Sequence, residues 1–500
     1  MWLTNKLSTD LIIAFITLII AAYFYIKHKY SYWKRKGVVQ LNPIFPFGNF
    51  EMKLPKGIKI GADSDKFYQA FKKMGVPYGG VYIGLSPNLV VMDPDIVKTI
   101  VTKDFASFVD RGLYQNPHKP ITRTLITQKG EDWKQSRSRF TAVLTSSKLR
   151  NLVNNVEHCK DDLINSLEKS SEAQKDVDVH HTLSLFITDL ITFLVFGVSA
   201  NSFKSETAEF NEFGMAFFQK FTFGHQLKLL VTQLYPDLSR KLNLSNIQEE
   251  INVFATEFVT KSVEYRRKNN VKGTGFLQML MDAQEAGMDI DMNEMISQSF
   301  VFFAGGLETS STTTTSVLYE LSKNKELQDK ARQEIISVKE KHGGKITYDY
   351  LMELNYIYQL IHEALRMYPL LLNIYRVCVQ DYELPGTDLV IEKGTQLIFP
   401  AIGYHRDADL FPDPMKFDPS RFDDFKNTKY RGYMPFGEGP RNCVASRLGI
   451  LQSKFALSVI LENFEVSPSS KTVEPLELEG TSFTLSLKTP IYLKFKQIKK

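Results

Sequence analysis

The sequence predicts a mainly helical protein with a small β region, an α+β fold class. Long helical patterns occupy most of the chain, strand-like runs are few and short, and those runs are widely spaced. Such spacing argues against a β-sandwich or a barrel, in which short strands follow one another closely. Of the 500 residues, 43% are hydrophobic and 23% are charged, which is ordinary globular composition and excludes a collagenous or largely disordered chain.

The chain begins with an apolar segment that is followed by basic residues. Residues 11–26 carry no charge, and the Lys and Arg residues just after them account for the whole net charge of +5, which argues against a basic nucleic-acid-binding face. Because the basic cluster follows the apolar run, the pattern predicts an uncleaved membrane anchor, with the rest of the chain in the cytosol, in preference to a cleaved signal peptide. We expect residues 1–36 to form the anchor and its basic flank, residues 37–50 a proline-containing linker, and residues 51–500 the globular domain.

A hairpin and several helices are expected in the first half of the globular domain. Residues 81–92 contain two strand-like runs, which predict a hairpin. Residues 151–168 keep a helical apolar stripe, and residues 181–197 are almost continuously apolar, as in a buried core helix. Residues 205–230 carry an aromatic stripe that favours the core but also suits the wall of a pocket for an apolar ligand: Phe210, Phe213, Phe217, Phe218, Phe221 and Phe223.

Short strands are expected nearer the carboxyl terminus. Residues 388–399 predict a hairpin with Gly394 at its turn. Residues 481–487 and 490–496 are short strand-like runs. The strands therefore lie at both ends of a long helical region, as the predicted fold class requires.

One cysteine lies in an unusual context. Cys159, Cys378 and Cys443 are far apart and form no C-x-x-C pair, which argues against a disulfide framework and a zinc ribbon. Cys443 ends the run FGEGPRNC, whose glycines and proline favour a tight turn that lets the backbone approach a flat group. A helical pattern follows, and a helix N-terminus favours a thiolate. A lone cysteine is usually an inert core residue, but this context argues against that interpretation.

FGEGPRNC strongly resembles the haem-binding loop of the cytochrome P-450 superfamily, the haem-thiolate monooxygenases. The resemblance implies a P-450 fold with a long central helix over haem b, and makes residues 51–500 the catalytic domain. It implies that Cys443 is the axial thiolate ligand of the iron. Arg441 is then expected to pair with a haem propionate, and Phe436 to contact the cofactor.

Further motifs of the same family follow in the expected order. WKQSR resembles the helix in which Trp133 and Arg137 bond a propionate, and cationic donors suit the two carboxylates of haem. Arg111 and Arg376 match further propionate-binding positions. Glu363 and Arg366 form an E-x-x-R pair three residues apart on a helix, and Arg421 in FDPSRF resembles the third member of this buried network. The resemblance gives this triad the role of holding the haem loop.

Residues 301–311, VFFAGGLETSS, resemble the oxygen-binding stretch of the long central helix. Two glycines and the hydroxyl residues that follow disfavour a plain helix, which predicts a local opening with room for a diatomic ligand. Thr309 is then expected to hydrogen-bond the oxygen, and Glu308 to help relay protons to it through water. The family usually has Gly where this chain has Ala445, and Ala where it has Gly449, which predicts altered haem tilt or potential with haem binding retained.

The resemblance implies a membrane-bound monooxygenase that inserts one oxygen atom from O2 into a lipophilic small molecule and reduces the other to water. The chain shows no G-x-G-x-x-G nucleotide motif, so NADPH-derived electrons are expected from a separate partner. By resemblance that partner is an NADPH-cytochrome reductase, with cytochrome b5 as an auxiliary donor. Two alternatives stay open: a haem-thiolate peroxide isomerase or dehydratase, against which the Glu308–Thr309 pair argues, and a non-catalytic haem sensor or carrier.

The anchor and the substrate pocket complete the expectation. The anchor is expected to hold the catalytic domain on the cytosolic face of the endoplasmic reticulum membrane. Within the superfamily the motifs look closest to the microsomal animal group that includes the insect detoxification branch. By resemblance, the pocket is lined by Val301, Ala304, Gly305, Leu371, Leu372, Phe483 and Thr484.

Overall fold

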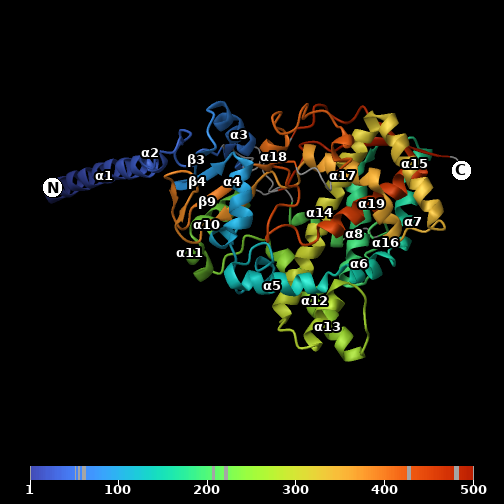
Figure 1. Cartoon of the computed structure of the whole chain (residues 1–500). Coiled ribbons are helices and arrows are strands. Elements are labelled where there is room, and N and C mark those ends of the chain that lie inside the picture. The colour runs from blue at the N-terminus through green and yellow to red at the C-terminus, as the bar shows by residue number, and fades with distance from the viewer. Residues whose placement is uncertain are drawn as a thin grey trace.

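Helices dominate the computed structural model, which describes residues 2–50, 52–53, 57–58, 63–204, 209–218, 223–424, 430–477 and 484–498. Small sheets accompany them, and this combination confirms the predicted mainly α fold class (Figure 1). The helices are α1 (Trp2–Lys29), α2 (Tyr32–Arg35), α3 (Asp63–Lys73), α4 (Pro94–Lys98), α5 (Gly130–Val143), α6 (Ser146–Val153), α7 (Lys160–Glu172), α8 (Val179–Phe196), α9 (Glu209–Ala216), α10 (Phe223–Leu234), α11 (Pro236–Lys241), α12 (Glu249–Asn269), α13 (Phe276–Glu285), α14 (Met292–Lys323), α15 (Lys325–Lys341), α16 (Tyr348–Glu353), α17 (Asn355–Met367), α18 (Ala401–His405) and α19 (Ser446–Asn463).

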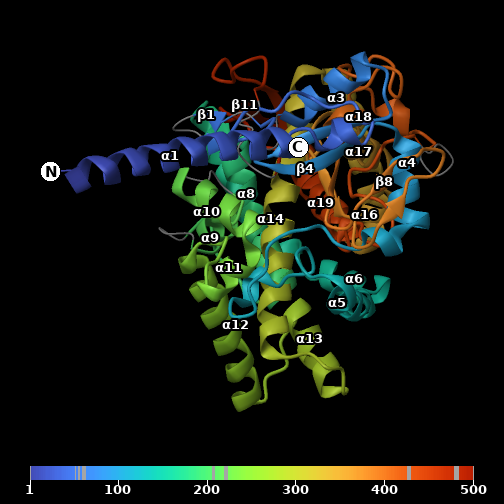
Figure 2. The ribbon, with the colours of Figure 1, turned by 90° about the vertical axis from the view of Figure 1, so that its left-hand side faces the viewer.

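The long helix α14 runs through the middle of the helical part, and α8 packs along it (Figure 2). α8 is buried along most of its length, which confirms the core helix predicted at residues 181–197. Its polar residues find partners close by: the Thr188 hydroxyl donates to the Ser184 carbonyl oxygen over 2.7 Å, and Asp189 accepts the backbone N–H of Ser202 over 2.8 Å. The buried helix therefore tolerates these two polar residues because each has a hydrogen-bond partner.

The main sheet has the strand order β3-β4-β9-β6 and lies at the end of the molecule nearest α1 (Figure 1). β3 and β4 form the predicted hairpin, β9 runs parallel to β4, and β6 runs antiparallel to β9. An isolated bridge from Asp110 to Val377 extends this pairing beyond β6. The strands are β1 (Met52–Lys53), β2 (Gly57–Ile58), β3 (Tyr78–Ile83), β4 (Ser86–Val91), β5 (Val177–Asp178), β6 (Ile374–Val377), β7 (Tyr382–Glu383), β8 (Val390–Ile391), β9 (Gln396–Phe399), β10 (Phe464–Pro468) and β11 (Tyr492–Gln497).

The helix predicted over residues 151–168 is broken. α6 ends at Val153 and α7 begins at Lys160. The apolar stripe continues across the break because Val156, in the turn, is buried like the helical residues around it. The turn is also fixed from outside, since the Asn154 side chain accepts the backbone N–H of Tyr348 over 2.9 Å. Apolar periodicity alone therefore concealed the break.

The hairpin predicted over residues 388–399 is also wrong. Both strands exist, and Gly394 makes the turn between them with φ of +91°. However, β8 pairs with β7, whereas β9 pairs with β4 and β6. Of the two runs predicted near the carboxyl terminus, 490–496 is confirmed as β11. In the other run, 481–483 lie outside the described residues, and the described part, 484–487, forms no strand, although Thr484 makes an isolated bridge to Leu371.

The aromatic stripe at residues 205–230 belongs to the core where it is described. Phe210 and Phe213 of α9 pack on phenylalanine rings of α12, with ring centroids 5.0 and 4.2 Å apart. Phe217 packs on a ring of α14 at 5.7 Å. Phe221 and the side chain of Phe223 lie outside the described residues.

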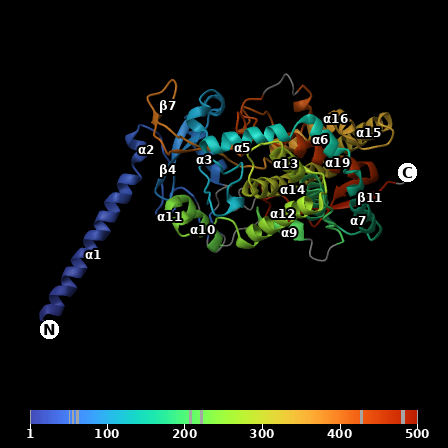
Figure 3. The ribbon, with the colours of Figure 1, turned by 90° about the horizontal axis from the view of Figure 1, so that it is seen from below.

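The N-terminal helix α1 projects away from the body in every view (Figures 1 to 3). Its residues Thr9–Lys29 have a mean hydropathy of 2.1, and none of that stretch is buried. α8 is also long and apolar enough to span a membrane, but it is mostly buried in the protein. An exposed apolar helix at the N-terminus fits membrane association.

The body begins before the predicted linker. Trp33 of α2 is 1% exposed, and its ring lies so close to Gly80 that a Cβ there would come within 2.3 Å of it. The backbone at Val39 and Leu41 pairs with Gly80 over 2.8 and 3.1 Å. Part of the segment predicted as basic flank and linker is therefore packed against the main sheet.

Candidate functional site

Cys443 follows a tightly turned loop that begins at Phe436. Gly437 and Gly439 have φ of +73° and +74°, a backbone conformation that favours glycine. A Cβ on Gly439 would lie 1.8 Å from the carbonyl oxygen of Val101, so the backbone approach there requires glycine. The backbone N–H of Cys443 donates to the Phe436 carbonyl oxygen over 2.8 Å and closes the loop. The glycines therefore fix the position of the thiol.

The side chain of Cys443 is exposed, yet protein atoms surround it, so the thiol faces an internal space. Burial raises the pKa of the thiol, whereas the backbone N–H of Ala445 and the guanidinium groups of Arg111 and Arg137 act to lower it. A metal ion in front of a thiol stabilises the thiolate strongly enough to overcome such burial. The loop therefore suits a cysteine that acts as a metal ligand.

Three arginines meet beside this loop, from three different parts of the chain. The bridge between Asp110 and Val377 brings Arg111 next to Arg376 of β6. Arg111 also donates to the carbonyl oxygen of Arg441 over 2.8 Å. Arg111, Arg376 and Arg441, all predicted to bind propionates, are therefore brought together.

The three guanidinium groups are short of negative charge. Burial, reinforced by repulsion from neighbouring arginines, lowers the pKa of Arg376 to about 9 and that of Arg441 to about 8; burial lowers the pKa of Arg111 to about 10. Within the described residues, the Nε atoms of Arg376 and Arg441 are buried without a hydrogen-bond partner. Asp110 lies 3.9 Å from Arg441. Because arginine stays charged in proteins, the cluster fits a ligand that brings carboxylates, as haem does.

Two residues of α5 complete the surroundings of the loop. Arg137 donates to the carbonyl oxygen and to the side-chain oxygen of Asn442, both over 2.7 Å. Trp133 is buried, and the guanidinium of Arg441 lies over its ring, 4.4 Å from the centroid. Both residues thus support the cysteine loop directly, and their bonds to a propionate stay a prediction.

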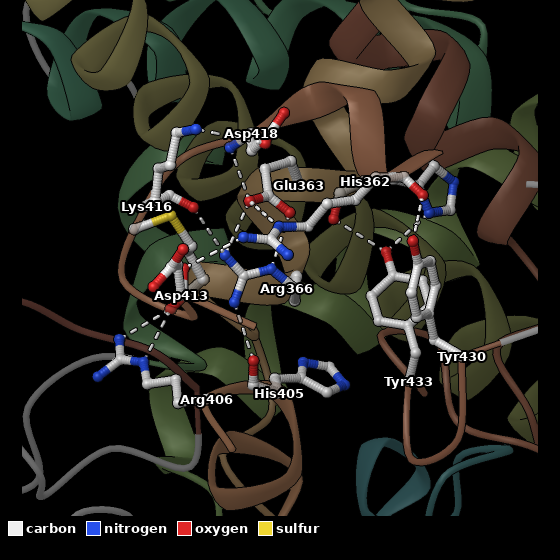
Figure 4. A network of polar contacts seen from close by, with 12 residues as sticks. His362, Glu363, Arg366, His405, Arg406, Asp413, Lys416, Asp418, Tyr430 and Tyr433 are labelled. Atoms are coloured by element: carbon white, nitrogen blue, oxygen red, sulfur yellow. Dashed lines mark hydrogen bonds and ion pairs between the residues drawn. The ribbon is translucent and has the colours of Figure 1, made fainter. Parts of the chain in front are cut away.

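A buried charge network joins α17 to the segments around His405 and Asp418. Arg366 donates to both carboxylate oxygens of Glu363, over 2.7 and 2.8 Å, and both side chains are fully buried (Figure 4). Arg366 also donates to the His405 carbonyl oxygen over 2.9 Å, and Asp418 donates its backbone N–H to Glu363 over 2.9 Å. Arg421 lies 3.4 Å from the same carboxylate. The predicted triad is therefore assembled in space.

α14 is a continuous α-helix through both glycines, so the predicted local opening does not occur. The hydroxyl residues after them do not break the helix, because most of them donate to the carbonyl oxygen one turn earlier. Thr309 donates in this way to Gly305 over 2.6 Å. The expected room lies instead beside Gly305, where a Cβ would meet no atom within 4 Å.

Glu308 has different surroundings from its neighbour Thr309. It is 7% exposed, and its Oε2 atom lies 3.6 Å from Nε2 of His180 on α8. The Thr312 hydroxyl donates to its Oε1 atom over 3.5 Å. Burial raises the pKa of Glu308, and these two neighbours act against the shift. A carboxyl group with a raised pKa is suited to hold and release protons near neutral pH.

The predicted pocket residues come from α14 and two later segments. Leu371 pairs with Thr484 in an isolated bridge and is 49% exposed. Leu372 is buried in a small apolar cluster near the same place. Phe483 lies outside the described residues. Three of the predicted pocket residues lie on α14. Val301 and Ala304 are buried, and Gly305 is not.

The comparison with known protein families decides what this site belongs to. The family model described as Cytochrome P-450 matches residues 51–495. The chain belongs to the cytochrome P-450 family. The P-450 motifs quoted from the sequence all lie within the matched residues.

Insect P-450s resemble this chain over nearly its whole length. Cytochrome P-450 6k1 of Blattella germanica is 33% identical, over 99% of this chain and 98% of that protein. Cytochrome P-450 6a2 of Drosophila melanogaster is 32% identical over 98% and 99%, and cytochrome P-450 6A1 of Musca domestica is 32% identical over 96% of each. The predicted likeness to insect P-450s is therefore confirmed.

Membership establishes the reaction class. This P-450 is a haem-thiolate monooxygenase, an oxidoreductase that uses haem with a cysteine thiolate ligand, O2 and electrons from a redox partner. Its substrates are lipophilic, as in the family. The isomerase and sensor alternatives are not favoured.

The two departures from the P-450 pattern are accommodated without strain. Ala445 has φ of −100°, which any residue adopts, so the backbone does not require the usual glycine. Gly449 lies on α19, and a Cβ there would come no closer than 4.0 Å to the Ser310 hydroxyl on α14. The usual alanine would therefore fit as well.

Sequence reasoning missed three residues of this P-450 site. Asn442 lies inside the recognised loop, and its bond to Arg137 had no separate signal. His180 approaches Glu308 from α8, 128 positions earlier in the chain, and only the fold brings the two together. Thr312 was noted only as one of several hydroxyl residues, although its helical spacing of four from Glu308 could have indicated the contact.

Proposed function

We propose that Cys443 is the axial ligand of this P-450 and that Arg111, Arg376 and Arg441 bind the two carboxylates of haem. One observation supports this above all: the buried guanidinium groups of Arg376 and Arg441 and the partly buried one of Arg111, short of negative charge, meet beside an accessible thiol. When bound, haem supplies the iron at which O2 is split, so that one oxygen atom enters the substrate and the other leaves as water. Phe436 contacts the cofactor from the start of the loop.

Arg137 and Trp133 have a positioning role in this proposal. Arg137 holds the loop through Asn442, next to the ligand cysteine. Trp133 supports the guanidinium of Arg441 from below its plane. A propionate within reach of either would add a charge-assisted or ring N–H bond. The triad of Glu363, Arg366 and Arg421 is proposed to keep the segments around the loop in place.

Thr309 and Glu308 are proposed to manage protons at the oxygen side. The Thr309 hydroxyl lies beside the open space at Gly305 and can turn from the carbonyl oxygen to a ligand there. Glu308 holds a proton readily because burial raises its pKa. In this proposal water links the Thr309 hydroxyl to the Glu308 carboxyl, because the two side chains contact different neighbours and not each other.

The substrate is proposed to lie against an apolar wall. Gly305 leaves the space on α14, and Leu371 offers exposed apolar surface next to Thr484. Burial of such surface favours a lipophilic ligand by about 25 cal/mol for each Å² removed from water. The other proposed wall residues are Val301, Ala304, Leu372 and Phe483.

The proposed partner is an NADPH-cytochrome reductase of the endoplasmic reticulum membrane, with cytochrome b5 as a second donor. Residues 1–36 are proposed as the anchor with its basic flank, residues 37–50 as the connection, and residues 51–500 as the catalytic domain on the cytosolic side. The exposed apolar part of α1 and the basic residues at its end support this orientation.

Reconstitution tests the proposal. The full chain in vesicles with an NADPH-dependent reductase is given isotopically labelled O2 and a panel of lipophilic compounds. We expect products that carry one labelled oxygen atom and consumption of NADPH. Products formed without labelled oxygen, or without reductase, would contradict the proposal. Turnover with a ferredoxin-type donor alone would contradict the partner only.

A further inference from the structure

A cavity of about 300 Å³, lined by both polar and apolar side chains, lies on the side of α14 that carries Glu308. The first turn of α8, residues of α9 and α14, and the chain segment around residues 485–491 enclose it. Exposed side chains such as His181 and Lys488 line it, so it reaches the surface. Cavities with several polar groups hold ordered water. The buried carboxyl of Glu308 therefore has a hydrated route to solvent.

His180 and Glu308 both line this cavity, and His180 is the more exposed of the two. Its side chain is 31% exposed, whereas that of Glu308 is 10% exposed. Its Nε2 atom lies 3.6 Å from Glu308 Oε2 and 3.3 Å from the Thr312 hydroxyl. Glu308 Oε2 is buried without a hydrogen-bond partner in the described part of the chain. The 3.6 Å between Nε2 and Oε2 is just beyond the length of a hydrogen bond.

We propose that His180 is a positioning residue of this P-450 that passes protons from the water of this cavity to Glu308. The inference rests on the proton-relay role proposed for Glu308. In the transfer, the N–H at Nε2 of protonated His180 breaks, and its proton bonds to Glu308 Oε2. Glu308 passes its proton on towards the oxygen side, and the neutral imidazole regains one that bulk solvent delivers through the cavity water, so charge and protons balance over the cycle.

Histidine suits this position because its imidazole can both accept and donate a proton. Charged groups of both signs line the same cavity: Asp178, the residue that caps α8, Glu308 and Lys488. The titratable groups that face His180 from the elements around the cavity are Asp178, His181, Glu308, Tyr319, Tyr368 and Lys488.

The experiment compares variants of the full-length holoenzyme. His180→Phe keeps the size of the ring and removes its protons, and His180→Lys restores a protonated side chain. His181→Phe is the matched control, because His181 lines the same cavity and its backbone N–H is what contacts Asp178. Glu308→Gln tests the relay on which the inference rests.

We measure product formed per NADPH, hydrogen peroxide release and the solvent isotope effect over a range of pH. We expect His180→Phe to lower product per NADPH about tenfold, less than the roughly 10²-fold that a positioned general acid or base supplies at the low end, because cavity water can replace part of the relay. The solvent isotope effect should rise and the pH dependence of coupling should flatten. His180→Lys should recover part of the coupling, and His181→Phe should match the wild type.

A second readout does not depend on turnover. The infrared band of the Glu308 carboxyl, isolated by subtracting the Glu308→Gln spectrum, should titrate at higher pH in His180→Phe, because a positive neighbour has been removed. Unchanged coupling and an unchanged band in His180→Phe would overturn the inference while Glu308→Gln still uncouples. If Glu308→Gln itself couples normally, the relay role fails first, and the inference with it. A double variant no worse than Glu308→Gln would support one shared path.

Discussion

Thr309 is the side chain whose replacement isolates oxygen handling from the rest of the site. Its hydroxyl donates to the Gly305 carbonyl oxygen over 2.6 Å, beside open space. Thr309→Ala removes the hydroxyl and leaves the helix intact, since alanine favours helix. We expect product per NADPH to fall about tenfold, the effect of losing a hydrogen bond worth about 1.4 kcal/mol, and hydrogen peroxide release to rise.

Thr314→Ala is the matched control for that variant. Thr314 lies on the same helix, is fully buried, and donates to the Ser310 carbonyl oxygen over 2.8 Å. It therefore shares the local bonding of Thr309 without the open space. Coupling should be unchanged in Thr314→Ala. Equal uncoupling in both variants would mean that the effect comes from the helix and not from oxygen handling.

His405 makes the stability of the fold depend on pH. Burial lowers its pKa to about 3, and its Nε2 atom accepts the backbone N–H of Met434 over 3.0 Å, so the folded ring is neutral. An unfolded histidine titrates near pKa ~6.5. Below that pH the unfolded chain binds more protons than the folded chain, so stability falls as pH drops from about 6.5 towards about 3.

The measurement is the thermal unfolding midpoint between about pH 7 and about pH 5. The wild-type midpoint should fall over this interval, and it should fall less in His405→Gln, whose amide oxygen still accepts the bond. Some decline should remain, because burial also lowers the pKa of His362 to about 3. An identical decline in the variant would exclude His405 as its cause.

At the scale of residues, the sequence predicted the functional residues that lie inside recognisable motifs. Arg441 and Cys443 share one loop, so a short pattern contains both. Arg111 and Arg376 were predicted by family likeness, and only the pairing of their neighbours shows why they meet. His180 had no signal, because a single histidine at the start of an apolar helix is not informative without its partner on α14.

At the scale of elements, the buried ion pair between Glu363 and Arg366 of α17 is the contact whose loss should destabilise the fold most. Glu363→Ala leaves a fully buried guanidinium without its carboxylate. Removing one partner of a buried ion pair costs roughly 3–5 kcal/mol. We therefore expect a lower unfolding midpoint and a lower haem content in the purified protein.

Glu257→Ala on α12 is the control, since it breaks the exposed pair with Lys261 and should leave stability unchanged. The Glu363→Ala molecules that retain haem should still show a thiolate-type spectrum, because Glu363 is bonded to Arg366 and Asp418 and not to Cys443. A spectrum of another type in that fraction would show that Glu363 acts on the ligand itself.

Elements were predictable where one local signal sufficed. The burial of α8 follows from its composition, and the hairpin of β3 and β4 from two adjacent runs. The pairing of β8 and β9 did not follow, because each strand finds a partner from elsewhere in the chain. The break between α6 and α7 depends on a contact with Tyr348, nearly 200 residues away.

At the scale of the whole molecule, the packing of Trp33 against Gly80 predicts that the stable body includes part of the basic flank before residue 36. Deletion of residues 2–26 removes the exposed part of α1 and keeps Trp33 in its place against Gly80. We expect this protein to bind haem and to shift towards the soluble fraction. Deletion of residues 2–36 also removes Trp33, and losing such a buried ring costs about 3–5 kcal/mol.

The longer deletion should therefore unfold at lower temperature and contain less haem. Trp33→Ala in the full chain separates the two effects, since it should lower stability while the protein stays with the membrane. Equal stability of both deletions would place the boundary at residue 36, as the sequence suggested. Loss of haem in the shorter deletion would mean that the apolar helix is part of the fold.

The absorption spectrum of the reduced, CO-bound protein tests the ligand assignment of Cys443 most directly. The wild type should show the thiolate-type band, and Cys443→Ser should lose it. Cys378→Ser and Cys159→Ser should keep it, since these cysteines lie apart from the loop. A thiolate-type band that persists in Cys443→Ser would contradict the assignment.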